Sequence, residues 1–223
     1  MLLSAIRNGD MLSIFVSLAA SAFVIFCTLP VHEFAHAFVA AKLGDDTAKL
    51  QGRLTINPMA HIDPFGAIML ALFGFGWAHP VPVNERNFKN RKSGVVLTSL
   101  AGPVANILMS FIMLLLLQII FTFSSGVSIF TKAIYIFLTY AAQINVMLAV
   151  FNLLPIPPLD GYRVLSVFLP PHIYYKVMQY EQYIMIGIMI LIFTGALTRP
   201  LSYLSNLLYS LLFKITSLPF MAF

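Results

Sequence analysis

The chain has 223 residues, of which 60% are hydrophobic and only 9% charged, and its formal net charge is +5. A soluble domain carries about 25% charged residues, so the composition excludes an ordinary soluble protein. Several apolar runs are long enough to cross a bilayer, and they predict an all-α polytopic membrane protein. The basic residues are not interleaved with aromatic residues on one face, which argues against nucleic-acid binding, and the single cysteine, Cys27, excludes an internal disulfide.

We expect one domain, residues 1–223, because no polar or Gly/Ser-rich linker divides the sequence. Its core is expected at about 15–165, followed by accessory helices at 182–223. About four to five transmembrane helices are expected in the bundle. The N-terminal residues precede a long apolar run without a small-residue cleavage site, so we interpret them as the start of a span rather than a signal peptide.

The first apolar run extends from Met11 to Ala41 and contains the sequence His32-Glu33-Phe34-Ala35-His36. On a helix, His32 and His36 are four residues apart and share a face, so both imidazoles can bind one zinc ion while Glu33 lies beside a metal-bound water. The alternative is a polar pair between helices. Three ionisable groups at bilayer depth are expensive and imply function by default, so the pattern predicts a metal site. Pro30 predicts a kink near Phe26.

The next segment is polar and then briefly apolar. Thr47 to Leu50 and Arg53 to Ile56 alternate in character around Gln51-Gly52, which predicts a small membrane-associated β-hairpin. Phe65 to Ala78 is apolar for only 14 residues and contains glycines, with Pro80 and Pro82 following. This length favours a short re-entrant segment over a full span.

Three later apolar segments complete the expected bundle. Gly94 to Phe123 is expected to cross the membrane, Lys132 to Leu154 to cross back, and Gln182 to Thr198 to cross again. The tail from Leu201 to Phe223 is expected to lie in the interface or to cross part-way.

The distribution of basic residues predicts the orientation. If residues 44–93 lie on one side, that side carries nine of the 13 basic residues: Lys42, Lys49, Arg53, Arg86, Lys89, Arg91, Lys92, Arg163 and Lys176. The positive-inside bias then makes it cytoplasmic, with the metal site near the cytoplasmic leaflet of what we expect to be the cell membrane.

A catalytic zinc usually has three protein ligands and one open position. The soluble extension of the motif is absent, because Val39 and Lys42 occupy the positions of its glycine and third histidine. Asp45, Asp46, Asp63 and Glu85 are interpreted as surface charges, Glu181 as an interfacial anchor, and His61 and His79 as loop residues. Asp160 follows three prolines that leave an extended chain able to direct a carboxylate at a metal; the alternative is a solvated Asp-Gly turn.

Three motifs together resemble the site-2 protease family of intramembrane zinc metalloproteases. They are His32 to His36, Ala101-Gly102-Pro103-Val104-Ala105-Asn106, and the stretch from Asn152 to Gly161. The resemblance implies that His32, His36 and Asp160 bind one Zn²⁺ and that Glu33 is the base. It also implies that Asn152 helps to hold the substrate backbone, and it supports the hairpin. We expect a short form without a PDZ or nucleotide-sensing domain.

The expected function is hydrolysis of peptide bonds within transmembrane segments of other membrane proteins, in regulated intramembrane proteolysis. Zinc activates a water whose proton Glu33 accepts, and the substrate helix must unwind, most simply by adding a strand to the hairpin edge. Two alternatives remain open at this point: a membrane metal-binding or transport protein, and a catalytically silent bundle that binds membrane clients. The sequence gives no oligomeric state.

Overall fold

The computed structural model describes residues 10–73, 76–124 and 128–220. Within these ranges the protein is mostly helical and contains no strand, which confirms the predicted all-α class. Three helical stretches are long and apolar enough to cross a membrane: Met11–Lys42, Arg91–Phe123 and Ile129–Asn152. The protein is therefore an integral membrane protein by helix length and composition.

The first of these stretches carries the predicted metal motif. It consists of α2 (Met11–Phe23), a π-helical turn η1 (Val24–Thr28) and α3 (Leu29–Lys42). Pro30 has no N–H to donate to the carbonyl of Phe26, so the regular α-helical pattern cannot continue there. The π-helical turn occupies the place where the sequence predicted a kink.

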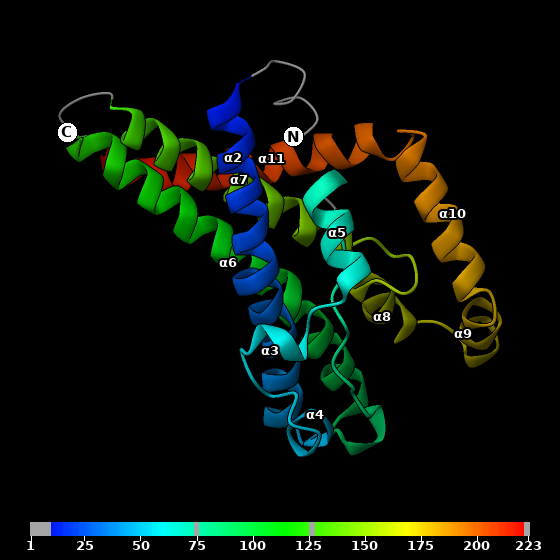
Figure 1. Ribbon diagram of the computed structural model, residues 1–223. Helices are drawn as coiled ribbons and strands as arrows, with labels where there is room; N and C mark the ends of the chain where they lie inside the picture. The colour runs from blue at the N-terminus through cyan, green and yellow to red at the C-terminus, as the bar shows by residue number, and fades with distance from the viewer. Residues whose placement is uncertain (1–9, 74–75, 125–127, 221–223) are drawn as a thin grey trace.

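The other two long helices, α6 (Arg91–Phe123) and α7 (Ile129–Asn152), form an antiparallel pair (Figure 1). Asn90 caps α6 by accepting a hydrogen bond from the Ser93 amide, and Ser128 and Thr131 form a capping box at the start of α7. Leu114 and Leu117 of α6 pack with Ala141 and Ala142 of α7, where small side chains allow close approach.

The C-terminal helices differ in part from the expectation. The segment predicted to cross at 182–198 forms α10 (Glu181–Phe193), whose 13 residues give about 20 Å, short of a hydrocarbon core of about 30 Å. Helix α9 (Pro171–Met178) precedes it. Helix α11 (Thr198–Ser217) lies across α6 and α7 (Figure 1), with Leu212 in their shared core.

The predicted β-hairpin is wrong. Thr47–Leu50 is a helical turn, α4, and the residues after it form turns rather than a strand. The Asp45 side chain accepts a hydrogen bond from the Thr47 amide at 3.1 Å, as in an Asx turn, and Ala48 is buried against α3. The alternation of polar and apolar side chains from Thr47 to Leu50 therefore belongs to one half-buried helical turn and not to a strand.

The short apolar segment predicted to be re-entrant begins and ends at neighbouring positions in the structure. Helix α5 (Pro64–Phe73) is flanked by Ile62 and Ala78, which pair in an isolated antiparallel bridge, and the His79 amide donates to the His61 carbonyl at 2.7 Å. Arg53 also donates to the carbonyl of His79 at 2.7 Å. These contacts hold the two ends of the segment side by side.

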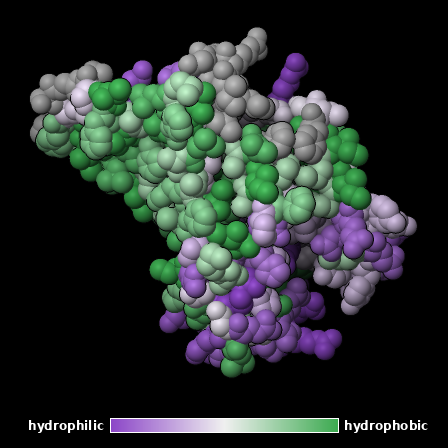
Figure 2. Space-filling view, viewed as in Figure 1, coloured by the Kyte–Doolittle hydropathy of each residue, from purple (hydrophilic) through white to green (hydrophobic). Residues whose placement is uncertain are grey.

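One end of the molecule is polar and tightly connected. Asp45, which is fully buried, accepts hydrogen bonds from the Asn84 amide at 2.7 Å and from the Asn87 side chain at 2.9 Å. It thereby connects the end of α3 to η3 (Glu85–Asn87), just before α6. Figure 2 shows hydrophilic residues gathered at this end and hydrophobic residues over α6, α7 and α2.

Candidate metal centre and active-site cavity

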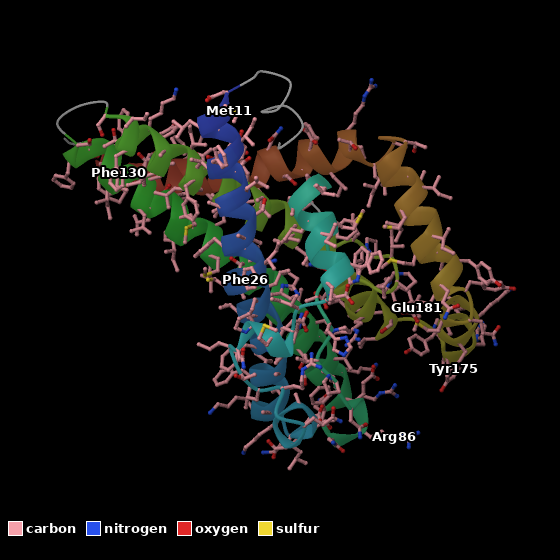
Figure 3. All side chains as sticks on the ribbon, viewed as in Figure 1. Met11, Phe26, Arg86, Phe130, Tyr175 and Glu181 are labelled. Atoms are coloured by element: carbon pink, nitrogen blue, oxygen red, sulfur yellow. The ribbon has the colours of Figure 1, made fainter. Side chains whose placement is uncertain are left out.

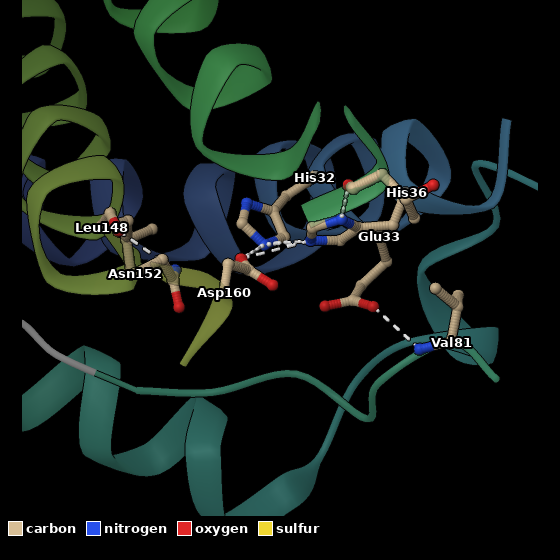
Figure 4. A network of polar contacts seen from close by, with 8 residues as sticks. His32, Glu33, His36, Val81, Leu148, Asn152 and Asp160 are labelled. Atoms are coloured by element: carbon tan, nitrogen blue, oxygen red, sulfur yellow. Dashed lines mark hydrogen bonds and ion pairs between the residues drawn. The ribbon is translucent and has the colours of Figure 1, made fainter. Parts of the chain in front are cut away.

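Three potential ligand atoms converge beside α3 (Figure 4). The Nε2 atoms of His32 and His36 are 3.0 Å apart, as their spacing on one helix face predicts. The Asp160 Oδ2 atom lies 3.4 Å from His32 Nε2 and 3.3 Å from His36 Nε2. Both histidines are buried, with 5% and 7% of their surfaces exposed. The structure thus brings Asp160 to the motif, as the sequence predicted.

Asp160 reaches this position because α7 ends at Asn152 and the chain turns back before α8 (Asp160–Ser166) begins. The prolines in this connection cannot continue a helix. Gly161 allows α8 to start close to the end of α7: a Cβ there would lie only 2.2 Å from the Leu153 carbonyl oxygen. The Asp-Gly pair is therefore part of a close backbone contact, not a solvated turn.

These three residues fit a zinc ion. Tetrahedral zinc with nitrogen and oxygen ligands at about 2.0–2.2 Å places its ligand atoms roughly 3.3 Å apart, which matches the observed separations of 3.0, 3.4 and 3.3 Å. Two imidazoles and one carboxylate are a donor set that zinc prefers. Three protein ligands would leave a zinc ion one position for water, as a catalytic site requires, and all three residues line the adjoining cavity.

Helix α6 orients the second histidine. His36 donates a hydrogen bond from Nδ1 to the Thr98 carbonyl at 2.7 Å, which fixes the tautomer that leaves Nε2 free to bind a metal. Gly102, one turn further along α6, lies directly against both imidazoles. A Cβ at Gly102 would be 2.3 Å from His36 Nε2 and 2.5 Å from His32 Nε2.

Glu33 lies on the same turn of α3 as the two ligands and is buried. Its Oε2 atom accepts a hydrogen bond from the Val81 amide at 3.0 Å, so the segment that follows α5 holds the carboxylate (Figure 4). His61, by contrast, bonds to the Thr55 carbonyl at 2.8 Å and does not belong to the ligand group.

The metal group and Glu33 line a cavity of about 290 Å³. Asn152, the residue predicted to hold substrate, lines the same cavity, and its Nδ2 donates to the Leu148 carbonyl at 3.0 Å. The lining also includes the apolar side chains Met185, Ile188 and Met189 of α10, together with Trp77.

Three contributions to the site were not foreseen from the sequence. Gly102 was noted as a small residue and as part of a motif, but its contact with the imidazoles depends on how α6 packs on α3. The Val81 amide carries no sequence signal at all. Glu181, interpreted as an interfacial anchor, instead lines the active-site cavity at the start of α10.

The contact at Gly102 gives a testable prediction. In Gly102→Ala, the added methyl group would overlap the imidazoles, so we expect the protein to fold but to lose most of its zinc and activity. Gly187→Ala in α10 is the matched control, because a Cβ there has no neighbour within 4 Å. Metal content per chain, measured on both purified variants, checks the prediction. Unchanged zinc affinity in Gly102→Ala would show that the contact is not critical.

Comparisons with known proteins agree with this geometry. The model for peptidase family M50 matches residues 20–194. YwhC of Bacillus subtilis, named as a candidate zinc metalloprotease, is 45% identical over 171 residues, covering 76% of this chain and 78% of its own. Rip2 of Mycolicibacterium smegmatis, named in the same way, is 28% identical over 204 residues, covering 87% and 73%. Rip2 of Mycobacterium tuberculosis H37Rv is 28% identical over 183 residues, covering 80% and 67%. No solved structure matches the chain.

Proposed function

Since this chain belongs to peptidase family M50, the site-2 protease family of intramembrane zinc metalloproteases, we propose that it cleaves transmembrane segments of other membrane proteins in regulated intramembrane proteolysis. The observation that carries the proposal is the convergence of His32, His36 and Asp160 beside Glu33 on a helix long and apolar enough to span a bilayer. A transporter needs ligands spread along a path, and a silent client-binding bundle has no need of a carboxylate in the position of a base.

The roles of the residues follow from their contacts. His32, His36 and Asp160 would hold one zinc ion, which when bound supplies Lewis-acid activation of water and of the scissile carbonyl. Glu33 accepts the proton of the attacking water and passes it to the leaving amine. The Val81 amide holds one Glu33 oxygen and leaves the other for this transfer. Asn152, which lines the same cavity as these residues, hydrogen-bonds the substrate backbone.

The substrate must enter laterally and unwind. We propose entry between α5 and α10, because α10 forms the apolar wall of the cavity and stands apart from the α6 and α7 pair (Figure 1). The expected pairing with a hairpin edge has to be abandoned, since Thr47–Leu50 is helical. The extended residues 79–82 beside the site cannot easily replace the hairpin edge as a pairing partner for the substrate. Pro80 and Pro82 have no N–H to donate, and the carbonyls of His79 and Pro80 already accept hydrogen bonds from Arg53.

Weak substrate helices should be cut most readily. Each unpaired backbone group costs several kcal/mol in lipid, and glycine and proline weaken a helix by about 1 and 3 kcal/mol relative to alanine. We therefore expect a model substrate with Gly or Pro near the scissile bond to be cleaved, and its all-leucine counterpart to be cleaved much more slowly although it binds about equally. Cleavage rates and co-purification of both substrates test this. Equal rates would show that local unwinding is not selective.

We further propose that residues 44–93 lie on the cytoplasmic side of the cell membrane. In this arrangement α5 is re-entrant, and four to five helices lie in or against the bilayer. The paired ends of the α5 segment and the polar surface in Figure 2 support this. In a Cys27→Ser background, Asp46→Cys and Asn90→Cys should react alike with an impermeant thiol reagent, and Phe130→Cys should react from the other side. Opposite labelling of the first two would mean that α5 belongs to a full crossing.

A further inference from the structure

Two further cavities continue from the active-site cavity along the first turns of α6. The first, about 150 Å³, shares with it Val83, Thr98, Ser99, Pro158, Arg163 and Glu181. The second, about 240 Å³, shares with the first Glu85, Val95, Ser166 and Tyr174. Because each cavity shares lining residues with the next, the three lie in a row that begins at the metal group. We call the two cavities beyond the active-site cavity the outlet groove.

The groove leads from the apolar part of the molecule to the polar part. Beside the metal group the walls include Trp77 and Ile188, whereas the far end is lined by Arg91, Lys92 and Tyr175. Figure 3 places Tyr175 and Arg86 at the end of the molecule that Figure 2 shows to be hydrophilic. The path therefore runs in the direction that a polypeptide takes when it leaves a membrane.

Two buried hydroxyl groups along the groove need partners. Tyr162 is only 4% exposed and Thr98 only 3%, and neither hydroxyl has a hydrogen-bond partner among the residues that the structure describes. Thr98 lines both the active-site cavity and the groove, and Tyr162 lines the groove. The Tyr162 ring stacks nearly parallel on Tyr174, with centroids 6.5 Å apart. Buried polar groups in proteins are normally paired, so these hydroxyls point to a ligand with hydrogen-bonding groups.

In the part of the groove next to the active-site cavity, the charges favour a neutral polar ligand over a phosphate or lipid headgroup, because Arg163 lies there with the two carboxylates Glu85 and Glu181. Arg91 is already paired with Glu85 at 2.8 Å, and Arg163 shares the first part of the groove with Glu181. The peptide groups of an unwound chain have the required chemistry. They have lost their helical hydrogen bonds, and each carries one donor and one acceptor that must be satisfied away from bulk water.

We propose that the outlet groove binds the extended backbone of the substrate on one side of the scissile bond. The Tyr162 and Thr98 hydroxyls form hydrogen bonds with its peptide groups, and the Tyr174 ring packs against its side chains. This inference rests on the proposed proteolytic function and adds a binding site for the part of the substrate that leads out of the bilayer. It also supplies partners for the unwound chain that the missing hairpin does not.

The first test uses two substrates with the same span and scissile bond, one carrying ten residues beyond the bond on the groove side and one truncated there. Tyr162→Phe removes only the hydroxyl, so it should raise the KM for the long substrate by about two- to tenfold, the effect of one hydrogen bond, and leave the short one unchanged. Tyr174→Ala should act in the same sense. Tyr203→Phe, at an exposed site on α11, is the control. If the variants still cleave but affect both substrates equally, the substrate does not bind in the outlet groove. If the parent protein cleaves neither substrate, the proposed proteolytic function is wrong instead.

A second test does not depend on turnover. In a Cys27→Ser, Glu33→Gln background, Ser166→Cys places a thiol where the two groove cavities meet. After addition of a mild thiol oxidant, which takes up the two electrons, single cysteines along the substrate should form a disulfide with it only at positions a few residues to one side of the scissile bond. Ser210→Cys on the exposed face of α11 should form none. Cross-linking that is absent at Ser166→Cys, or spread equally over both sides of the bond, would show that the chain leaves by another route.

Discussion

Glu33→Gln should abolish peptide cleavage while leaving about one zinc ion per chain bound. The substitution keeps the size of the side chain, and the amide oxygen of Gln can still accept the hydrogen bond from the Val81 amide. What is lost is the group that accepts a proton, and general-base catalysis contributes about 10²- to 10⁴-fold to rate. Cleavage of a transmembrane substrate by purified protein, together with metal analysis of the same sample, measures both quantities.

The matched control for this variant is Asp46→Asn, which also replaces a carboxylate by an amide but at an exposed position beyond the end of α3. It should retain the parent activity. Full activity in Glu33→Gln would contradict the assignment of Glu33 as the base. Loss of zinc in Glu33→Gln would instead mean that the residue acts mainly in holding the site together.

Asp160→Ala should lose both zinc and activity, because the ion would be left with two imidazoles from the same helix. The carboxylate lies 3.3–3.4 Å from both Nε2 atoms and is the only contribution from α8 to the ligand group in the described structure. Mutation of a residue that only hydrogen-bonds to a metal ligand commonly lowers metal affinity by about 10- to 100-fold. Loss of Asp160, a direct ligand, should therefore lower it further. Chelator competition on the purified variant measures the affinity.

Asp46→Ala serves as the control for the loss of one negative charge, and it should bind zinc as the parent does. The thermal transition of Asp160→Ala measures its folding separately from its zinc binding. A variant that keeps parental zinc affinity and still cleaves would remove Asp160 from the ligand set.

Much of this protein follows from local sequence features. The long apolar runs around Met11–Lys42, Arg91–Phe123 and Ile129–Asn152 fix three helices, because a chain in lipid must satisfy its own backbone hydrogen bonds. The spacing of His32 and His36 fixes a shared helix face. The prolines before Asp160 fix the end of a helix and the return of the chain. These are properties of a few neighbouring residues, and sequence periodicity records them directly.

Short elements were predicted less well, since their conformation depends on partners distant in the chain. The alternation at Thr47 to Leu50 resembled a strand, but the burial of Ala48 against α3 favours a helical turn, which follows an Asx turn at Asp45. Glu181 resembled an interfacial anchor until the position of α10 brought it to the active-site cavity.

The sequence by itself determined the class of protein, the metal motif and the residues that could complete it, because composition, helical period and proline positions act locally. Only the tertiary structure decided that Gly102 touches both imidazoles, that the Val81 amide holds Glu33, and that Thr98 and Tyr162 line one cavity beside the active-site cavity. Each of these contacts joins segments separated by tens of residues. Their distances depend on how whole helices pack, and no periodicity within one segment encodes that.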